Sequence, residues 1–179
     1  MKLYRLICLV MALIVLTACT PSEVPPPPIV SSPKLVTLEP NFQATTGQTI
    51  YVPIYSHIYY ENRQKYFDLA ATLSIRNTDL TSPMIVTAVR YYDTNGKLLR
   101  QYVEKPIQLD ALASTDFVVD RNDTSGGSGA NFIVEWVAKT KISEPIVEAV
   151  MIGSALQQGI SWISPGRVIK QTNSQELPN

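Results

Sequence analysis

Residues 66 to 76 read YFDLAATLSIR, and this stretch decides the fold class. Apolar side chains recur there at every second position: Phe67, Leu69, Ala71, Leu73 and Ile75. Successive side chains of a β-strand point to opposite faces of a sheet. The period of two therefore predicts a strand with one buried face, which ends at the turn-forming residues 77 to 79.

The same period of two occurs upstream, in residues 49 to 60. Even positions there are mainly aliphatic, and odd positions carry what we call the tyrosine face: Tyr51, Tyr55, His57 and Tyr59. We expect a strand that buries its aliphatic side. Tyrosine offers a large contact area at low entropic cost and is enriched at binding surfaces. The tyrosine face is therefore a candidate ligand or partner surface, unless a second sheet covers it.

Downstream, Asn95-Gly96 separates two strand-like runs. Asn-Gly accepts the positive φ angles of a type I′ turn, so we predict a hairpin of Met84–Asp93 and Lys97–Glu104. Four further strands are expected: Thr115–Asp120, Asn131–Lys139, Ile146–Ile152 and Gly159–Ile163. Apolar spacing typical of a helix is missing, and the one weak candidate, residues 149 to 158, is interrupted by Gly153.

Together these runs predict an all-β domain over residues 35–169. About seven to nine strands with turn residues between them are typical of an antiparallel β-sandwich, immunoglobulin-like with Greek-key connections. A β-barrel is the alternative. The polar residues 170–179 are expected to form a flexible tail.

The N-terminal region has the layout of an export signal. Lys2 and Arg5 precede an apolar run over residues 6–16, which is shorter than the roughly 20 residues that a membrane-spanning helix needs. Leu16-Thr17-Ala18-Cys19 then resembles the lipobox of bacterial lipoproteins. The resemblance implies that residues 1–18 are a signal peptide, and that Cys19 carries a diacylglycerol and a further acyl chain such as palmitate.

Such a chain would be held in the cell envelope by its lipid anchor. Residues 19–34 are rich in proline and predict a semi-rigid polyproline spacer. In a host with two membranes, Thr20 lacks the aspartate that often retains lipoproteins at the inner membrane, so we expect the outer membrane, facing the periplasm. Because Cys8 lies in the leader, the exported chain has no disulfide and no thiol metal ligand.

Charge and composition exclude several partners. The formal net charge of the chain is zero, which argues against nucleic acid, since that partner needs a basic patch. Nucleotide loops fail as well, because Ala130-Asn131 follows the glycines where a Walker loop needs lysine, and a strand rather than a helix comes next. No cofactor is indicated.

The glycine-rich stretch DTSGGSGANF, residues 123–132, is a second candidate surface. Its candidate residues are Asp123, Ser125, Gly126, Gly127, Ser128, Gly129 and Asn131. The simpler interpretation is a turn, in which Asp and Thr bond nearby backbone amides. A calcium site is the minority alternative, although Ser125 replaces the glycine of an EF-hand loop. With a single histidine and no thiol, the usual ligands cannot build a closed zinc site.

A serine hydrolase is the alternative function. Gly126-Gly127-Ser128-Gly129-Ala130 approximates a nucleophile elbow, with His57 as the base and a carboxylate such as Asp123 as its partner. The elbow depends on a strand-to-helix turn, however, and a strand is predicted after this loop. We therefore expect a non-catalytic module that binds an envelope protein or glycan, or that assists envelope assembly.

From about Thr49 to Ile169 the chain resembles a family of bacterial lipoproteins that shares a domain of unknown function, the 3124 type. The segments that carry the resemblance are YVPIYSHIYY, FDLAATLSIRNTD, VRYYDTNGKLL, DTSGGSGANFIVEW and EAVMIGSALQQGISWISPGR, in this order. The family has no assigned activity, so the resemblance implies one envelope domain and provides no catalytic residues to carry over to this chain.

Overall fold

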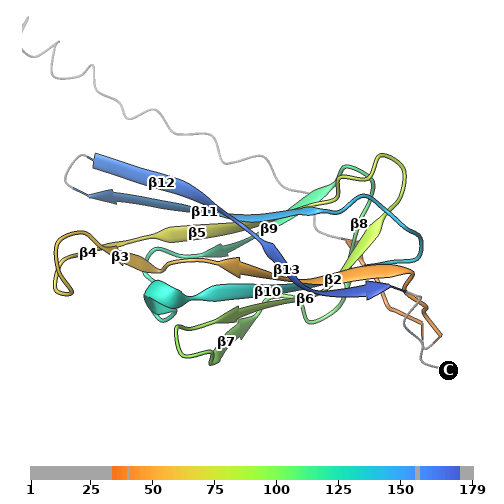
Figure 1. Ribbon diagram of the computed structural model, residues 1–179, viewed down its shortest axis with the longest axis horizontal. Helices are drawn as coiled ribbons and strands as arrows, with labels where there is room; N and C mark the ends of the chain where they lie inside the picture. The colour runs from red at the N-terminus through yellow and green to blue at the C-terminus, as the bar shows by residue number, and fades with distance from the viewer. Residues whose placement is uncertain (1–33, 40, 156–157, 174–179) are drawn as a thin grey trace, which may run out of the picture. The chain divides into compact units, whose positions relative to one another are not determined.

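The computed structural model describes residues 34–39, 41–155 and 158–173 (Figure 1). The expected leader, Cys19 and the spacer up to residue 33 lie outside these residues, as do residues 174–179. Within the described ranges the regular elements are strands, apart from one short 3₁₀ turn, η1 (Gly127–Gly129). None of the helices in this part of the chain has the length and apolar character needed to span a membrane.

The larger sheet has the strand order β1-β8-β6-β10-β2-β13, and β7 also pairs with β6. All its pairs are antiparallel, and β7 and β8 pair with successive parts of the same edge of β6. Its strands are β1 (Lys34–Leu35), β2 (Thr46–Pro53), β6 (Met84–Tyr92), β7 (Leu98–Gln101), β8 (Ile107–Leu109), β10 (Asn131–Ala138) and β13 (Arg167–Asn173).

The smaller sheet has the order β12-β11-β5-β9, again with antiparallel pairs. It contains β5 (Ala70–Arg76), β9 (Ser114–Val119), β11 (Ile146–Ala155) and β12 (Gln158–Pro165). A two-stranded hairpin of β3 (His57–Tyr59) and β4 (Tyr66–Asp68) lies at one end of the two layers (Figure 1). Both sheets have free edges, so they form an open sandwich and the predicted sandwich is confirmed.

The strand order has the centre of an immunoglobulin-like Greek key. There, strands B and E pair in one sheet while C and F pair in the other. Here β5 pairs with β9, and β6 with β10. The flanking strands differ, because β2 lies beside β10 where the last strand of an immunoglobulin domain lies, and β11 takes the place of the first. The prediction therefore holds for the four central strands and is wrong for the flanking ones.

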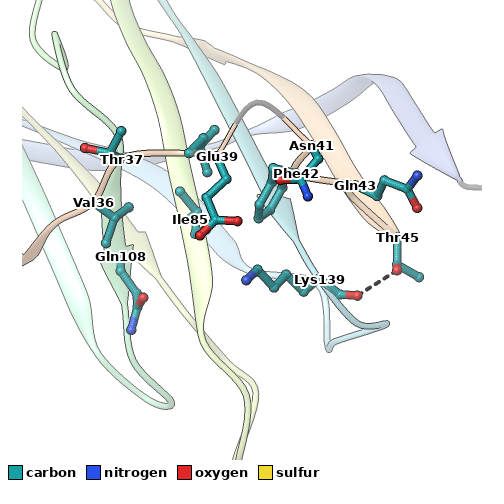
Figure 2. A pocket seen from close by; sticks show the side chains of 11 residues that line it. Val36, Thr37, Glu39, Asn41, Phe42, Gln43, Thr45, Ile85, Gln108 and Lys139 are labelled. Carbon is teal, nitrogen blue, oxygen red and sulfur yellow. Dashed lines mark hydrogen bonds between the residues drawn. The ribbon is translucent and has the colours of Figure 1, made fainter.

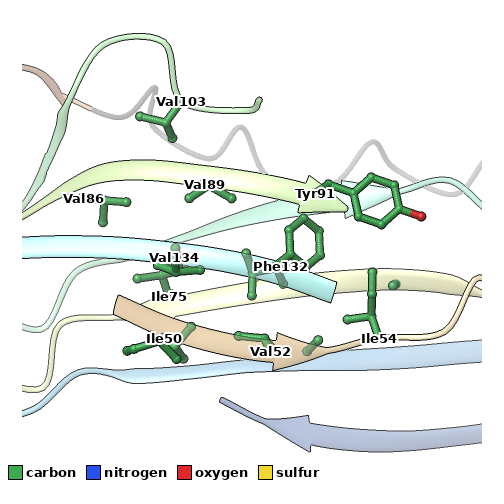
Figure 3. Packing of buried hydrophobic residues seen from close by; sticks show 14 of the residues in the cluster. Ile50, Val52, Ile54, Ile75, Val86, Val89, Tyr91, Val103, Phe132 and Val134 are labelled. Carbon is green, nitrogen blue, oxygen red and sulfur yellow. The ribbon is translucent and has the colours of Figure 1, made fainter. Parts of the chain in front are cut away.

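The predicted alternation is confirmed in the core. Leu69, Leu73 and Ile75 have no exposed surface, and the aliphatic residues of β2 are buried in the same way. Figure 3 shows Ile75 of β5 among side chains from β2, β6 and β10. The largest fully buried side chains include Trp136, Tyr91 and Phe132. Burial of one aliphatic or Phe side chain contributes about 1.5 to 3 kcal/mol, so this cluster dominates the folding energy.

Several local predictions need correction. The strand expected over residues 49 to 60 is broken after Pro53, and the stretch 66 to 76 is broken at Leu69, which divides β4 from β5. The weak helix candidate is strand β11, because its backbone pairs with β5 and β12. Strand pairing also continues past Lys170 to Asn173, where a tail was expected.

The hairpin at Asn95-Gly96 is confirmed, but its turn is not type I′. Gly96 has a φ of 78°, and Asn95 is not among the residues with positive φ. The Gly96 N–H donates to Asp93 O (3.0 Å), and the Asp93 N–H donates to Lys97 O (3.0 Å). This is the three-residue loop with a glycine bulge. The Asp93 carboxylate favours it by accepting bonds from the N–H groups of Asn95 (2.8 Å) and Lys97 (2.9 Å).

The loop after β5 is fixed by polar side chains. Asn77 is 2% exposed, and its Nδ2 donates to three carbonyl oxygens, of Ser82, Leu109 and Asp110. The neighbouring Asp79 carboxylate accepts bonds from backbone N–H groups, and the bond from Ser143 has the largest effect on its pKa. These bonds lower the pKa of Asp79 from 3.8 to about 2.

We predict that Asp79→Asn flattens the acid dependence of stability. Because the folded pKa is the lower one, the charged carboxylate stabilises the fold above about pH 4, and this contribution is lost as the pH falls to about 2. Urea unfolding at several pH values should show that the free energy of unfolding decreases less for the variant than for wild type as the pH falls. Asp116→Asn, which removes an exposed carboxylate on β9, is the control. Its free energy of unfolding should depend on pH as that of wild type does. The same dependence of unfolding free energy on pH in wild type and Asp79→Asn would contradict this account.

Candidate functional site

The glycine-rich loop is a series of turns. Asp120 accepts bonds from Asn122 and Asp123 N–H groups, and the Asp123 carboxylate accepts one from Ser125 N–H (3.2 Å). Asp123 Oδ2 also lies 3.1 Å from Arg100 Nη2. The acidic side chains thus bond the loop itself, as the simpler interpretation of this stretch predicted. Within the described residues, no group of three or more His, Cys, Asp or Glu side chains could hold a metal ion.

Gly126 is required because the loop touches the core at this point. A Cβ added there would lie 2.0 Å from Tyr91 Oη and 2.7 Å from Ser56 Oγ. These two hydroxyls, 3.0 Å apart, form a buried hydrogen bond. Burial also raises the pKa of Tyr91, so its hydroxyl stays protonated over the physiological range. The contact fixes the loop against β6 and the residue that precedes β3.

Backbone hydrogen bonds hold three segments together at this end of the sandwich (Figure 1). The carbonyl of Gly126 accepts bonds from both the N–H and Oγ1 of Thr94, in the β6–β7 turn. Thr94 Oγ1 in turn accepts one from Gly129 N–H (3.0 Å). The carbonyl of Gly127 accepts a bond from Ser56 N–H (3.0 Å), which connects η1 to the start of β3.

Four side chains share one face of the β3–β4 hairpin, and we call this the hairpin face: His57, Tyr59, Tyr66 and Asp68. His57 pairs with Asp68 and Tyr59 with Tyr66, and cross-strand partners lie on the same side of a sheet. The His57 ring centroid lies 5.2 Å from that of Tyr59 and 5.4 Å from that of Tyr66. Tyr59 and Tyr66 are 46% and 52% exposed, so their rings are accessible to a ligand.

Asp68 carries an unsatisfied acceptor that solvent does not reach. Its Oδ1 is buried and has no hydrogen-bond partner among the described residues. A buried polar atom without a partner costs free energy, so such an atom calls for an explanation. The opposite side of the hairpin is apolar, with Ile58 packed against the core and Phe67 against Tyr60. Sequence reasoning missed this role of Asp68, because the alternation shows the face of a residue but not its hydrogen bonds.

The predicted tyrosine face is not continuous, because β2 ends at Pro53. Tyr51 lies in β2 and is half-buried, paired with Ile133 and Arg167. Tyr55 follows the break, and its ring lies 6.1 Å from Trp162 of β12. His57 and Tyr59 belong to the separate hairpin. Two of the four predicted residues therefore share a surface, together with Tyr66 and Asp68.

The residues of the hydrolase alternative are not joined. His57 Nε2 bonds Tyr59 Oη (3.2 Å), and no hydrogen bond connects it to Ser128 within the described chain. Ser128 lies in η1, which leads through Ala130 into strand β10, so no α-helix follows the serine. Asn131 is the first residue of β10 and pairs with Pro53 and Tyr92. The loop thus lacks the strand-to-helix geometry on which an elbow depends.

A cavity of about 580 Å³ lies at the other end of β2 (Figure 2). It is lined by residues 36–39, 41–43 and 45, together with Ile85, Gln108 and Lys139. Thr45 Oγ1 donates to Lys139 O (2.7 Å), and Lys139 Nζ lies 5.7 Å from the Phe42 ring centroid. Phe42 is the one aromatic residue among those that line it. The hairpin face instead presents the neighbouring rings of His57, Tyr59 and Tyr66, so it is the better candidate site.

Comparison with known proteins gives one match. Residues 47–169 match the family described as "Protein of unknown function (DUF3124)". No curated protein matches the chain, and no solved structure does so either.

Proposed function

Since the chain belongs to the DUF3124 family of proteins of unknown function, we propose a non-catalytic, glycan-binding function at the hairpin face. In this proposal the protein is anchored by lipid in the cell envelope and presents the sandwich domain on a proline-rich spacer.

The observation that carries the proposal is the cluster of neighbouring rings, in which Tyr59 and Tyr66 are about half exposed beside His57. The neighbouring rings of Tyr59 and Tyr66 offer apolar surface for the C–H groups of a sugar and hydroxyls for its polar edge. A small number of polar groups among aromatic side chains is typical of ligand sites.

The hairpin face is also held in place before a ligand arrives. Leu69 N–H donates to Ser56 O (2.9 Å), and Ser56 N–H donates to Gly127 O (3.0 Å). Ile58 packs against the core from the other side of the hairpin. A surface that is already ordered loses less conformational entropy on binding, so its contacts yield more affinity.

The membrane anchor rests on the sequence. Leu16-Thr17-Ala18-Cys19 supports lipidation at Cys19, and two or more acyl chains give stable attachment where a single chain gives only reversible binding. In a host with two membranes, the proposed location is the outer membrane, facing the periplasm. A glycan of the envelope, such as peptidoglycan, is within reach of a domain on such a spacer.

We predict that Tyr59→Ser combined with Tyr66→Ser weakens binding to purified peptidoglycan sacculi. Loss of two aromatic contacts, each worth more than about 1 kcal/mol, should lower the affinity of the full-length protein tenfold or more in co-sedimentation. Tyr60→Ser is the matched control, because Tyr60 is 54% exposed but contacts Phe67 on the opposite side. Equal binding by wild type and the double variant would refute the site, and so would an equal loss with Tyr60→Ser.

Metabolic labelling with palmitate tests the anchor separately. Wild type and Cys8→Ser should incorporate the label and fractionate with membranes. Cys19→Ser should do neither, since the acyl chains are expected on that sulfur. Label retained in Cys19→Ser, or absent from wild type, would rule out the proposed lipidation.

A further inference from the structure

Strand β12 forms one edge of the smaller sheet. It pairs with β11 over its whole length, and no other strand of the described chain pairs with it. Its second row of backbone N–H and C=O groups therefore has no strand partner among the described residues. Gln158, Gly159, Ile160, Ser161 and Ile163 are all exposed. A free edge of this kind is a template for strand addition.

Apart from a proline at its end, this edge has none of the features by which proteins protect exposed strands. Charged side chains, short length and covering contacts are the usual devices. The sequence of β12, QGISWISP, carries no charge. Pro165 blocks bonding at its last position alone.

The other edges of the two large sheets, within the described part of the chain, are protected. On the larger sheet, β13 carries Arg167 and Lys170, while β7 carries Arg100 and β1 has two residues. The opposite edge of the smaller sheet, β9, carries Asp116. One carbonyl of β9, that of Val118, already accepts a bond from Tyr102 Oη (2.9 Å). The contrast singles out β12 as the edge that is open to pairing.

Apolar side chains flank the free edge on both faces of the sheet. Ile160 is 41% exposed on the side that faces the core, opposite Gly153 of β11. Ile163 is 58% exposed on the outer side, opposite Val150, and Ile152 of β11 adds another exposed side chain there. A strand added to this edge would remove apolar surface from water on both faces.

We propose that β12 pairs antiparallel with β12 of a second copy of the protein, around a two-fold axis at Ser161. In this register Ile160 of each copy lies opposite Trp162 of the other, an apolar-aromatic pair of the kind that stabilises sheets. Gly159 lies opposite Ile163, and Pro165 stays outside the paired residues. A two-fold contact brings identical surfaces together, so it suits a strand without charges, which meets no like charge in its own copy.

A second copy fits this edge better than the proline-rich spacer of the chain does. Residues 19–33 contain six prolines, which have no N–H to donate to a ladder. The contact involves one strand of eight residues from each copy, whereas a standard stable interface involves about 20 to 30 residues a side. The dimer is therefore expected to be weak and to depend on concentration. This inference is independent of the proposed glycan site.

A charge introduced at Ser161, the residue that would lie opposite itself in the second copy, tests the dimer. Sedimentation of the full-length protein, purified in the form that cells make, should show wild type shifting from monomer to dimer as concentration rises. Ser161→Lys and Ser161→Glu should each stay monomeric, because like charges would lie directly opposite each other. An equimolar mixture of the two should dimerise again. Ser114→Lys, an exposed serine on the opposite edge strand β9, is the control and should dimerise like wild type.

Each other outcome overturns the proposal. Wild type that stays monomeric at every concentration would show that no second copy occupies the edge, and would leave it to a different protein. Dimers of Ser161→Lys as strong as those of wild type would place the contact elsewhere. Failure of the mixture to recover, while both variants unfold at the wild-type temperature, would refute the two-fold axis at Ser161.

Discussion

The apolar inner faces of the two sheets have to cover each other, because water would otherwise contact the open side of each. Every strand that contributes to the core obeys this requirement through its alternation, as Leu73 of β5 and Val134 of β10 illustrate. Greek-key connections follow from the same need, since β5 and β9 lie in one layer while β6 and β10 lie in the other. The strand ends then set where the loops can lie.

The sandwich positions the hairpin face through a small number of contacts at one end. The hydrogen bond between Tyr91 and Ser56 joins β6 to the chain that enters β3, and the backbone of Gly126 packs directly on it. Thr94 connects the same loop to the β6–β7 turn. Buried contacts therefore determine the position of exposed residues such as Tyr59 and Tyr66. The glycines of the loop serve this packing, and the proposed ligand surface lies beside them.

Much of the fold could be predicted from the sequence, because a strand with one buried face carries apolar residues at every second position. Local patterns predict the strands, the burial of the odd-numbered residues from 69 to 75, and the hairpin at Asn95-Gly96. Pairing partners do not, since alternation shows which face is buried and not which edge a strand joins. Strand β13 has mostly exposed side chains and is held by its backbone, so apolar spacing could not reveal it.

The candidate site was predictable in part for similar reasons. Tyrosines and a histidine at alternate positions indicated an aromatic surface, and His57 and Tyr59 do lie on the hairpin face. The break after Pro53 separates Tyr51 and Tyr55 from it. Tyr66 and Asp68 come from the partner strand, which a single run of sequence does not identify. The lone acceptor of Asp68 is a property of the folded chain alone.

Backbone amide chemical-shift mapping of the full-length protein, titrated with soluble peptidoglycan fragments, tests the glycan site most directly. The account predicts saturable shifts centred on β3, β4 and the residues around Ser56, with the cavity near Lys139 unaffected. Shifts confined to that cavity, or none at saturating fragment, would contradict it.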